Sequence, residues 1–139
     1  MRLGLLAGEM SGDILGAALV SALIKRSEDF QVTGVGGQKL SALGLDSLYP
    51  MDRLSVMGLV EPLKRLPELL SIRRAVYRQQ LAWRPDVFLG IDSPDFNLTL
   101  ERRLRAKGLR TAHLVSPSVW TWRSGRIHSI GKAVDLMMC

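Results

Sequence analysis

Residues 85–97, PDVFLGIDSPDFN, contain the pattern that decides the fold. The apolar run at 87–91 follows a proline, and it predicts a short buried strand. Two carboxylates, Asp92 and Asp95, come directly after that strand, where the chain leaves the sheet. Ligands bind at this edge of open α/β sheets. The stretch therefore predicts an active-site crevice that contains a candidate general base.

Strands and helices alternate along the rest of the chain. Apolar runs predict strands, and apolar residues at helical spacing predict the helices between them. The expected strands are residues 3–6, 31–35, 48–49, 87–91, 111–115 and 133–138. The expected helices are 14–23 after an N-cap at Ser11, a short helix closed by Gly44, a stretch at 55–83 interrupted by Pro62 and Pro67, 98–107 and 123–130. This alternation predicts an α/β fold with a doubly wound parallel sheet.

Length and composition bound the class of protein. The 139 residues suffice for one domain with a core, and the single cysteine, Cys139, excludes an internal disulfide. No apolar run approaches the roughly 20 residues that a membrane span needs, and residues 1–7 are too short for a signal peptide. These features favour a protein of the cytoplasm.

The net charge of +6 is concentrated in clusters. They are Arg73, Arg74 and Arg78; Arg102, Arg103, Arg105, Lys107 and Arg110; and Arg123, Arg126 and Lys132. Such clusters usually form solvated helix faces, but they also suit anionic lipid, a phosphorylated ligand or nucleic acid. Nucleic acid is disfavoured as a partner, because no aromatic residue interleaves with the central cluster.

The sequence carries no familiar cofactor motif. The glycines at 34–37 follow a predicted strand but lack the G-x-G-x-x-G spacing, and no G-x-x-x-x-G-K-[ST] motif occurs. The histidines, carboxylates and cysteine do not have metal-ligand spacing. We therefore expect neither a nucleotide cofactor nor a metal. His113 is expected to pack in the core, and His128 to lie at the surface.

A first polar loop follows the strand at 3–6. It contains Glu9, Ser11, Gly12 and Asp13, at the start of the next helix. The two carboxylates would repel a phosphate there, whereas they and the hydroxyl can bind sugar hydroxyls. Alternatively, Ser11 and Asp13 only cap that helix.

A last polar loop, VSPSVWTWR at 115–123, combines indole rings with hydroxyl groups. A flat apolar platform beside hydrogen-bonding groups suits a sugar or an acyl chain. The residues concerned are Ser116, Ser118, Trp120, Trp122 and Arg123. Both tryptophans are equally suited to the core, since Trp is usually largely buried.

Four segments together resemble one known family. They are residues 7–13 (AGEMSGD), 56–58 (VMG), 85–97 (PDVFLGIDSPDFN) and 115–123 (VSPSVWTWR). In this order and with similar gaps, they resemble the N-terminal half of the lipid-A-disaccharide synthase family. The resemblance covers essentially the whole chain, and four segments in register are far more specific than any one of them.

The resemblance implies an inverting glycosyltransferase of the GT-B type, which has two Rossmann-like domains. Such an enzyme joins UDP-2,3-diacylglucosamine to 2,3-diacylglucosamine 1-phosphate, forms a β-1,6-linked disaccharide and releases UDP. Residues 1–139 are then the acceptor-side, N-terminal domain, and the donor-binding domain lies outside this chain. The apolar run that stops at Cys139 also suggests one half of a longer protein. A homodimer is one option for the full-length form.

The resemblance also implies roles for individual residues. Asp92 is the implied base, which takes the proton from the acceptor 6-hydroxyl as this attacks the anomeric carbon. Asp95 and Asn97 are implied substrate ligands, with loop organisation as the alternative for Asp95. The alternative for Asp92 is a turn carboxylate that bonds nearby backbone N–H groups. A Rossmann-like binding module without catalysis is the alternative function.

The segment around the two prolines suggests contact with a membrane. Its apolar side chains, followed by arginines, suit an interfacial patch on an anionic membrane surface. The residues concerned are Val56, Met57, Leu59, Val60, Leu63, Leu66, Leu69 and Leu70. Because both substrates of the family carry acyl chains, we expect a peripheral protein at the cytoplasmic face of the inner membrane. Packing in the core explains many of the same positions equally well.

Overall fold

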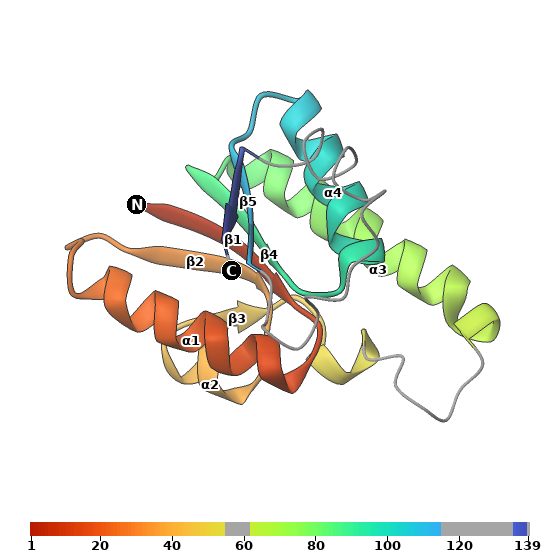
Figure 1. Cartoon of the computed structure of the whole chain (residues 1–139), viewed down its shortest axis with the longest axis horizontal. Coiled ribbons are helices and arrows are strands. Elements are labelled where there is room, and N and C mark those ends of the chain that lie inside the picture. Colours follow the sequence, from red (N-terminus) through yellow and green to blue (C-terminus); the bar gives the residue numbers. More distant parts are fainter. Residues whose placement is uncertain (55–61, 115–134, 139) are drawn as a thin grey trace.

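The computed structural model describes residues 1–54, 62–114 and 135–138 of the chain (Figure 1). Within them lies a sheet of six parallel strands, in the order β3-β2-β1-β4-β5-β6. The strands are β1 (Arg2–Ala7), β2 (Gln31–Val35), β3 (Asp46–Ser47), β4 (Val87–Ile91), β5 (Thr111–Leu114) and β6 (Leu136–Met138). The predicted parallel sheet is confirmed, with β1 and β4 at its centre.

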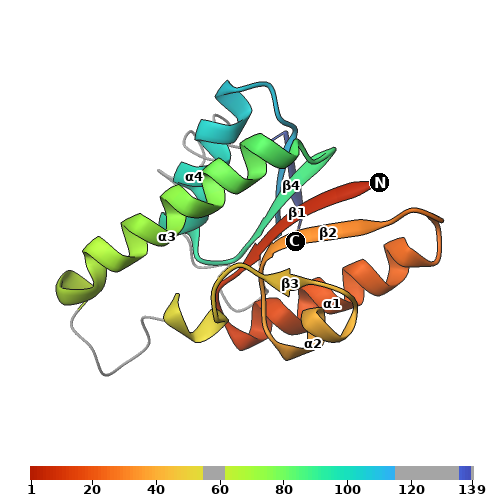
Figure 2. The ribbon, with the colours of Figure 1, turned by 180° about the vertical axis from the view of Figure 1, so that it is seen from behind.

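Helices cover both faces of the sheet (Figure 1), and Figure 2 shows the same layers from behind. One face carries α1 and α2, and the other carries α3 and α4. The helices are α1 (Met10–Ile24), α2 (Gln38–Ala42), α3 (Pro62–Trp83) and α4 (Pro94–Ala106), with a short 3-10 turn η1 (Met51–Arg53). This arrangement confirms the predicted doubly wound, Rossmann-like fold.

The pleat of the strands divides the core into two layers. Leu5 of β1 packs with Val20 of α1 and Leu40 of α2, whereas its neighbour Leu6 packs with Leu104 of α4 on the opposite face. Leu5 and Leu6 are both fully buried, and burial of such a side chain contributes about 1.5–3 kcal/mol. Because the central strands β1 and β4 are covered on both faces, apolar residues and glycine fill them almost throughout.

Glycine ends two helices at the predicted positions. Gly44 follows α2 with φ +108°, and its N–H donates to the Ser41 carbonyl at 3.1 Å. The next N–H, of Leu45, donates to the Leu40 carbonyl at 3.2 Å, which completes a Schellman motif. Gly108 ends α4 with φ +90° and the same pair of hydrogen bonds.

Three predicted boundaries are wrong. α1 begins at Met10, so Ser11 lies inside its first turn and does not cap it; Glu9 occupies the N-cap position without a side-chain cap hydrogen bond. The short strand is at 46–47 instead of 48–49, because these residues pair with β2. α4 begins at Pro94 instead of residue 98, since proline is tolerated in the first turn of a helix.

Proline does not interrupt the long helix. Pro62 is the first residue of α3, and Pro67 lies inside it, so the helix runs unbroken to Trp83. The missing N–H of Pro67 removes one hydrogen bond near the helix start, and the remaining turns compensate for it. The predicted helix at 123–130 and the strand residues 115, 133 and 134 lie outside the described residues.

Candidate active site

The two central strands place their loops side by side. The register pairs Ala7 of β1 with Ile91 of β4, so Gly8 and Asp92 leave the sheet together at its carboxyl edge. From this pair the strand order runs through β2 to β3 on one side and through β5 to β6 on the other. Such a switch point is where ligands bind in open α/β sheets. The predicted location of Asp92 beside the 7–13 loop is therefore confirmed.

Asp92 and Ser93 form a tight turn between β4 and α4. Both have a left-handed backbone, with φ of 50° and 42°. Non-glycine residues in this region cost on the order of 1–3 kcal/mol each, and a residue before proline normally takes an extended conformation. The turn therefore persists because its surroundings hold it. Asp92 is largely buried there, with 6% of its surface exposed.

Asn97 holds this turn from the first part of α4. Its side-chain nitrogen, Nδ2, donates to the carbonyl oxygens of Asp92 at 3.0 Å, Ile91 at 3.2 Å and Leu6 at 3.5 Å. Asn97 is fully buried. Because the three carbonyls lie at the ends of β1 and β4, one amide group joins both strands to the turn.

Gly8 brings the first loop into contact with the turn. A Cβ atom at this position would lie 3.2 Å from Ser93 Oγ and 3.4 Å from Leu54 Cβ, so Gly8 packs closely against the side chains of Ser93 and Leu54. Glu9, which is half-buried, and Ser11, which is exposed, follow Gly8 into the first turn of α1. A carboxylate and a hydroxyl thus come from the loop that contacts the Asp92 turn.

Asp13 is buried behind this loop and caps α2. Its carboxylate accepts hydrogen bonds from the backbone N–H groups of Gly37 at 2.9 Å, Lys39 at 3.0 Å and Leu40 at 3.1 Å. A helix start leaves such donors unpaired, so the carboxylate satisfies them from another helix. Asp13 is therefore a capping residue, as the alternative prediction had it, but of α2 instead of α1. A Cβ at Gly37 would lie 2.8 Å from Asp13 Cγ, which explains a glycine there.

A buried acid and base lie beneath α4. Glu101 Oε1 and His113 Nδ1 are 2.8 Å apart, and both side chains are fully buried. Burial raises the pKa of Glu101 to about 7, against the lowering effects of the hydrogen bond and charge of His113 and of a backbone hydrogen bond at Gly90. His113 is in the core, as predicted. Sequence reasoning missed Glu101, although a charged residue on the apolar side of an amphipathic helix was a usable signal.

The other predicted site residues divide into two groups. One group lies at the carboxyl edge of the sheet, either just after a strand or in the first turns of the helix that follows it. Its members are Glu9, Ser11, Gly12, Asp13, Asp92, Asp95 and Asn97. Outside the described residues are Ser116, Ser118, Trp120, Trp122 and Arg123, together with Val56, Met57, Leu59 and Val60.

The described part of the apolar segment is split between surface and core. Leu66 and Leu70 of α3 are exposed, with 45% and 40% of their surfaces accessible. Leu69 instead packs against the core layer under α3 and α4. Leu63 lies in the first turn of α3. Leu66 and Leu70 are therefore surface residues, whereas Leu69 is half-buried against the core.

Basic side chains from α3 and α4 approach one another. The Arg73 guanidinium lies 5.9 Å from the centre of the Phe96 ring, in a cation–π arrangement. Burial, and then the charges of Arg103 and Arg102, lower the pKa of Arg73. The two helices thus share a basic surface that extends toward the start of α4.

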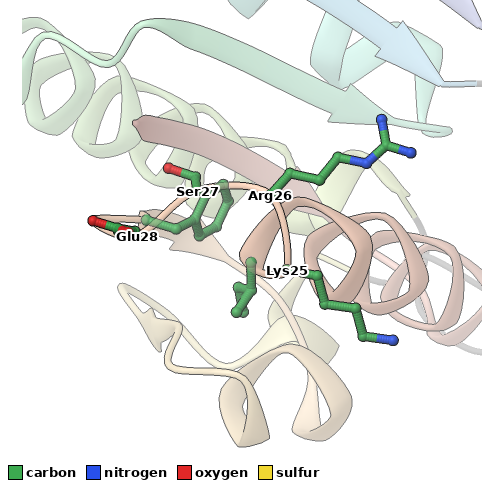
Figure 3. A pocket seen from close by; sticks show the side chains of 6 residues that line it. Lys25, Arg26, Ser27 and Glu28 are labelled. Carbon is green, nitrogen blue, oxygen red and sulfur yellow. The ribbon is translucent and has the colours of Figure 1, made fainter.

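The described residues contain no group of three or more His, Cys, Asp or Glu side chains that could hold a metal ion. Among the described helices, none is both long enough and apolar enough to cross a membrane. A hollow at the turn between α1 and β2, shown in Figure 3, is lined by Ile24, Lys25, Arg26, Ser27, Glu28 and Phe30. It lies where β2 begins, at the edge opposite Asp92, and is separate from the candidate site.

A parallel α/β sheet with a carboxylate at its switch point defines a Rossmann-like domain of the ligand-binding or catalytic class. The sequence profile of the lipid-A-disaccharide synthetase family matches residues 3–139. The chain belongs to this family, whose members are GT-B glycosyltransferases.

Curated relatives support this assignment. Over 138 residues the chain is 59% identical to the lipid-A-disaccharide synthase of Chromohalobacter salexigens, and over 137 residues it is 60% identical to that of Saccharophagus degradans. The Pseudomonas aeruginosa protein of the same name is 56% identical over 138 residues. Each alignment covers 99% of this chain but only 35–36% of the relative. The chain thus spans little more than a third of the length of these relatives.

Proposed function

We propose that residues 1–139 are the acceptor-side, N-terminal domain of an inverting glycosyltransferase. The reaction joins UDP-2,3-diacylglucosamine to 2,3-diacylglucosamine 1-phosphate, giving a β-1,6-linked disaccharide and UDP. The observation that carries the proposal is the Asp92 carboxylate, on a strained turn at the switch point of a chain of this family. A second Rossmann-like domain, outside this chain, binds the donor.

Asp92 serves as the general base. Its carboxylate takes the proton from the acceptor 6-hydroxyl while that oxygen attacks the anomeric carbon of the donor. The new carbon–oxygen bond forms as the bond to the UDP phosphate oxygen breaks, and UDP leaves with the electron pair. Attack from the face opposite the leaving group inverts the anomeric centre. General base catalysis of this kind contributes roughly 10²–10⁴-fold to the rate.

The remaining site residues bind or shape the acceptor sugar. Glu9 and Ser11 are supported as direct ligands by their accessible side chains next to the Asp92 turn. Gly12, Asp13 and Asn97 contribute by shaping the backbone around the sugar. Substrate contacts of Asp95, Ser116, Ser118, Trp120, Trp122 and Arg123 are proposed from the family resemblance.

The proposed partner surface is an anionic membrane, at the cytoplasmic face of the inner membrane. Exposed Leu66 and Leu70 on α3 support it, because apolar side chains beside arginines suit an interfacial contact. Arg74 of α3 and Arg102 of α4 are also exposed and add positive charge. The segment at 56–63 would extend this contact, and acylated substrates would be drawn from the same surface. Dimerisation of the full-length form is part of the same proposal.

A chimeric enzyme tests this function. The chain replaces the matching segment of the Chromohalobacter salexigens relative, to which it is 59% identical. We expect the chimera to form the disaccharide and UDP at a rate within roughly tenfold of the parent enzyme, a difference of about 1.4 kcal/mol in the barrier. A chimera that folds and binds both substrates without turnover would contradict the proposal and support a binding module without catalysis.

A further inference from the structure

We propose that Asn97, Glu101 and His113 form a buried positioning network, which holds the Asp92–Ser93 turn in its left-handed conformation and so directs the Asp92 carboxylate. None of these three side chains needs to touch substrate for this role. The catalytic consequence rests on the proposed function, whereas the conformational consequence does not.

The network begins at the backbone of the turn. Asn97 Nδ2 donates to the Asp92 carbonyl at 3.0 Å and to the Ile91 carbonyl at 3.2 Å. The turn has two consecutive left-handed, non-glycine residues before a proline, an arrangement that does not persist without support. A donor fixed on α4 favours the one backbone conformation in which both carbonyls point toward it.

The network continues one helical turn further along α4. Asn97 and Glu101 are four residues apart, so they lie on one face of the helix. Both side chains pack against the same glycine of β4: a Cβ at Gly90 would overlap Glu101 Oε1 and lie 2.9 Å from Asn97 Cγ. Gly90 thus leaves the space in which both side chains lie under the helix.

The pair of Glu101 and His113 ties this face of α4 to β5. Their side chains are 2.8 Å apart and fully buried, and Gly90 is the register partner of His113. The contact therefore fixes α4 against β5, which is the neighbour of β4, the strand that ends directly before Asp92.

The polar groups of the network come at a cost to stability. Within the part of the chain that the structure describes, Asn97 Oδ1 and Glu101 Oε2 are buried without a hydrogen-bond partner. Buried polar groups of this kind destabilise a fold relative to well-packed apolar residues. Leucine would fill the same interior, as Leu100 and Leu104 do on neighbouring positions of α4. A role in positioning accounts for polar residues where packing alone favours apolar ones.

The test compares Asn97→Leu with Gln80→Leu. Gln80 is the matched control, because it is also a fully buried amide on the same side of the sheet and donates to Thr33 Oγ1 at 3.1 Å, away from the turn. Both substitutions exchange a fully buried amide for an apolar side chain of similar size, so comparing their melting temperatures controls for the general effect on stability. In the chimera, Asn97→Leu should lower kcat by roughly 10²-fold with little change in KM, as expected for a misplaced catalytic group. Gln80→Leu should leave both constants near those of the unmodified chimera.

Glu101 supplies the conservative comparison. Glu101→Gln keeps a side chain that can bond His113 and should retain kcat, whereas Glu101→Leu should lower it. An independent readout is the backbone of Asp92 and Ser93, followed by NMR couplings and Cα shifts in residues 1–139. These should report left-handed φ values in the wild type and Gln80→Leu, and lose them in Asn97→Leu.

The outcomes separate this inference from the proposed function. An unmodified chimera without activity would count against the proposed function, and the NMR comparison would then decide the positioning role alone. Equal losses of kcat in Asn97→Leu and Gln80→Leu, or a turn unchanged in Asn97→Leu, would overturn the inference. If Asn97→Leu does not fold, equal kcat values for Glu101→Gln and Glu101→Leu would overturn it as well.

Discussion

The Asp13 carboxylate of α1 accepts a hydrogen bond from the Leu40 N–H of α2 at 3.1 Å, across the interface between the two helices. With its bonds to two further N–H groups, this contact makes the first polar loop and the start of α2 one structural unit. Asp13 therefore links the first turn of α1, which contains Ser11 and follows Glu9, to the start of α2.

Asp13→Ala should lower the free energy of unfolding by about 1–3 kcal/mol, because it leaves three backbone donors at the start of α2 without their acceptor. Urea unfolding of residues 1–139, followed by circular dichroism, measures this. Glu28→Ala is the control, since Glu28 is exposed and caps no helix start. A midpoint that falls equally in both variants would show that Asp13 does not hold α2.

Glu101 should make the stability of the chain depend on pH. Burial raises the pKa of Glu101 to about 7 in the folded chain, from an ordinary 4.5. Between these values the folded state keeps a proton that the unfolded state has lost, so stability falls as pH rises. The slope reaches at most about 1.4 kcal/mol per pH unit. Thermal melts from pH 4.5 to 7 should show this slope in the wild type and a smaller one in Glu101→Gln; equal slopes would refute the assignment.

The exposed leucines of α3 should contribute more to membrane binding than to the stability of the fold. Leu66→Ser and Leu70→Ser should weaken binding to vesicles that contain anionic lipid, and they should lower the melting temperature less than a core truncation does, because 45% and 40% of their surfaces remain accessible in the fold. Ile72→Ala should do the reverse: Ile72 is 2% exposed, and its truncation should cost about 2–5 kcal/mol of stability. Vesicle binding that survives both serine substitutions would assign any lipid contact to the arginines or to residues 56–63.

The fold was predictable because its central strands are buried on both faces. The largely apolar run at 87–91 gives the strand at that position, and Gly44 and Gly108 mark the helix ends that the structure has. Asp92 was predictable as an edge residue for the same reason, since it directly follows such a run. Parallel strands then require that it lies at the same edge of the sheet as the 7–13 loop, and the pairing of β1 with β4 places the two side by side.

The details of the site depend on contacts between distant parts of the chain. The role of Asn97 in holding the turn was not predictable, because one of its acceptors is the Leu6 carbonyl, 91 residues earlier. The predicted start of α4 was four residues too late because Asp92 and Ser93 adopt left-handed conformations, which shorten the loop to a tight turn. Neither residue is a glycine, so the sequence does not indicate these conformations. Ser11 was predicted to cap α1 because serine is common at N-caps, but α1 begins one residue earlier. The hydrogen bonds of Asp13 to the start of α2 join residues 24 or more positions apart and have no local sequence signal.

The measurement that tests the central claim most directly is steady-state kinetics of the chimera with Asp92→Asn. The amide has nearly the same size and keeps hydrogen-bonding capacity, but it cannot accept the proton of the acceptor hydroxyl at neutral pH. We predict a kcat lower by roughly 10²–10⁴-fold, with KM for both substrates little changed and the melting temperature retained. Turnover near that of the unmodified chimera would contradict the account and remove Asp92 from the mechanism.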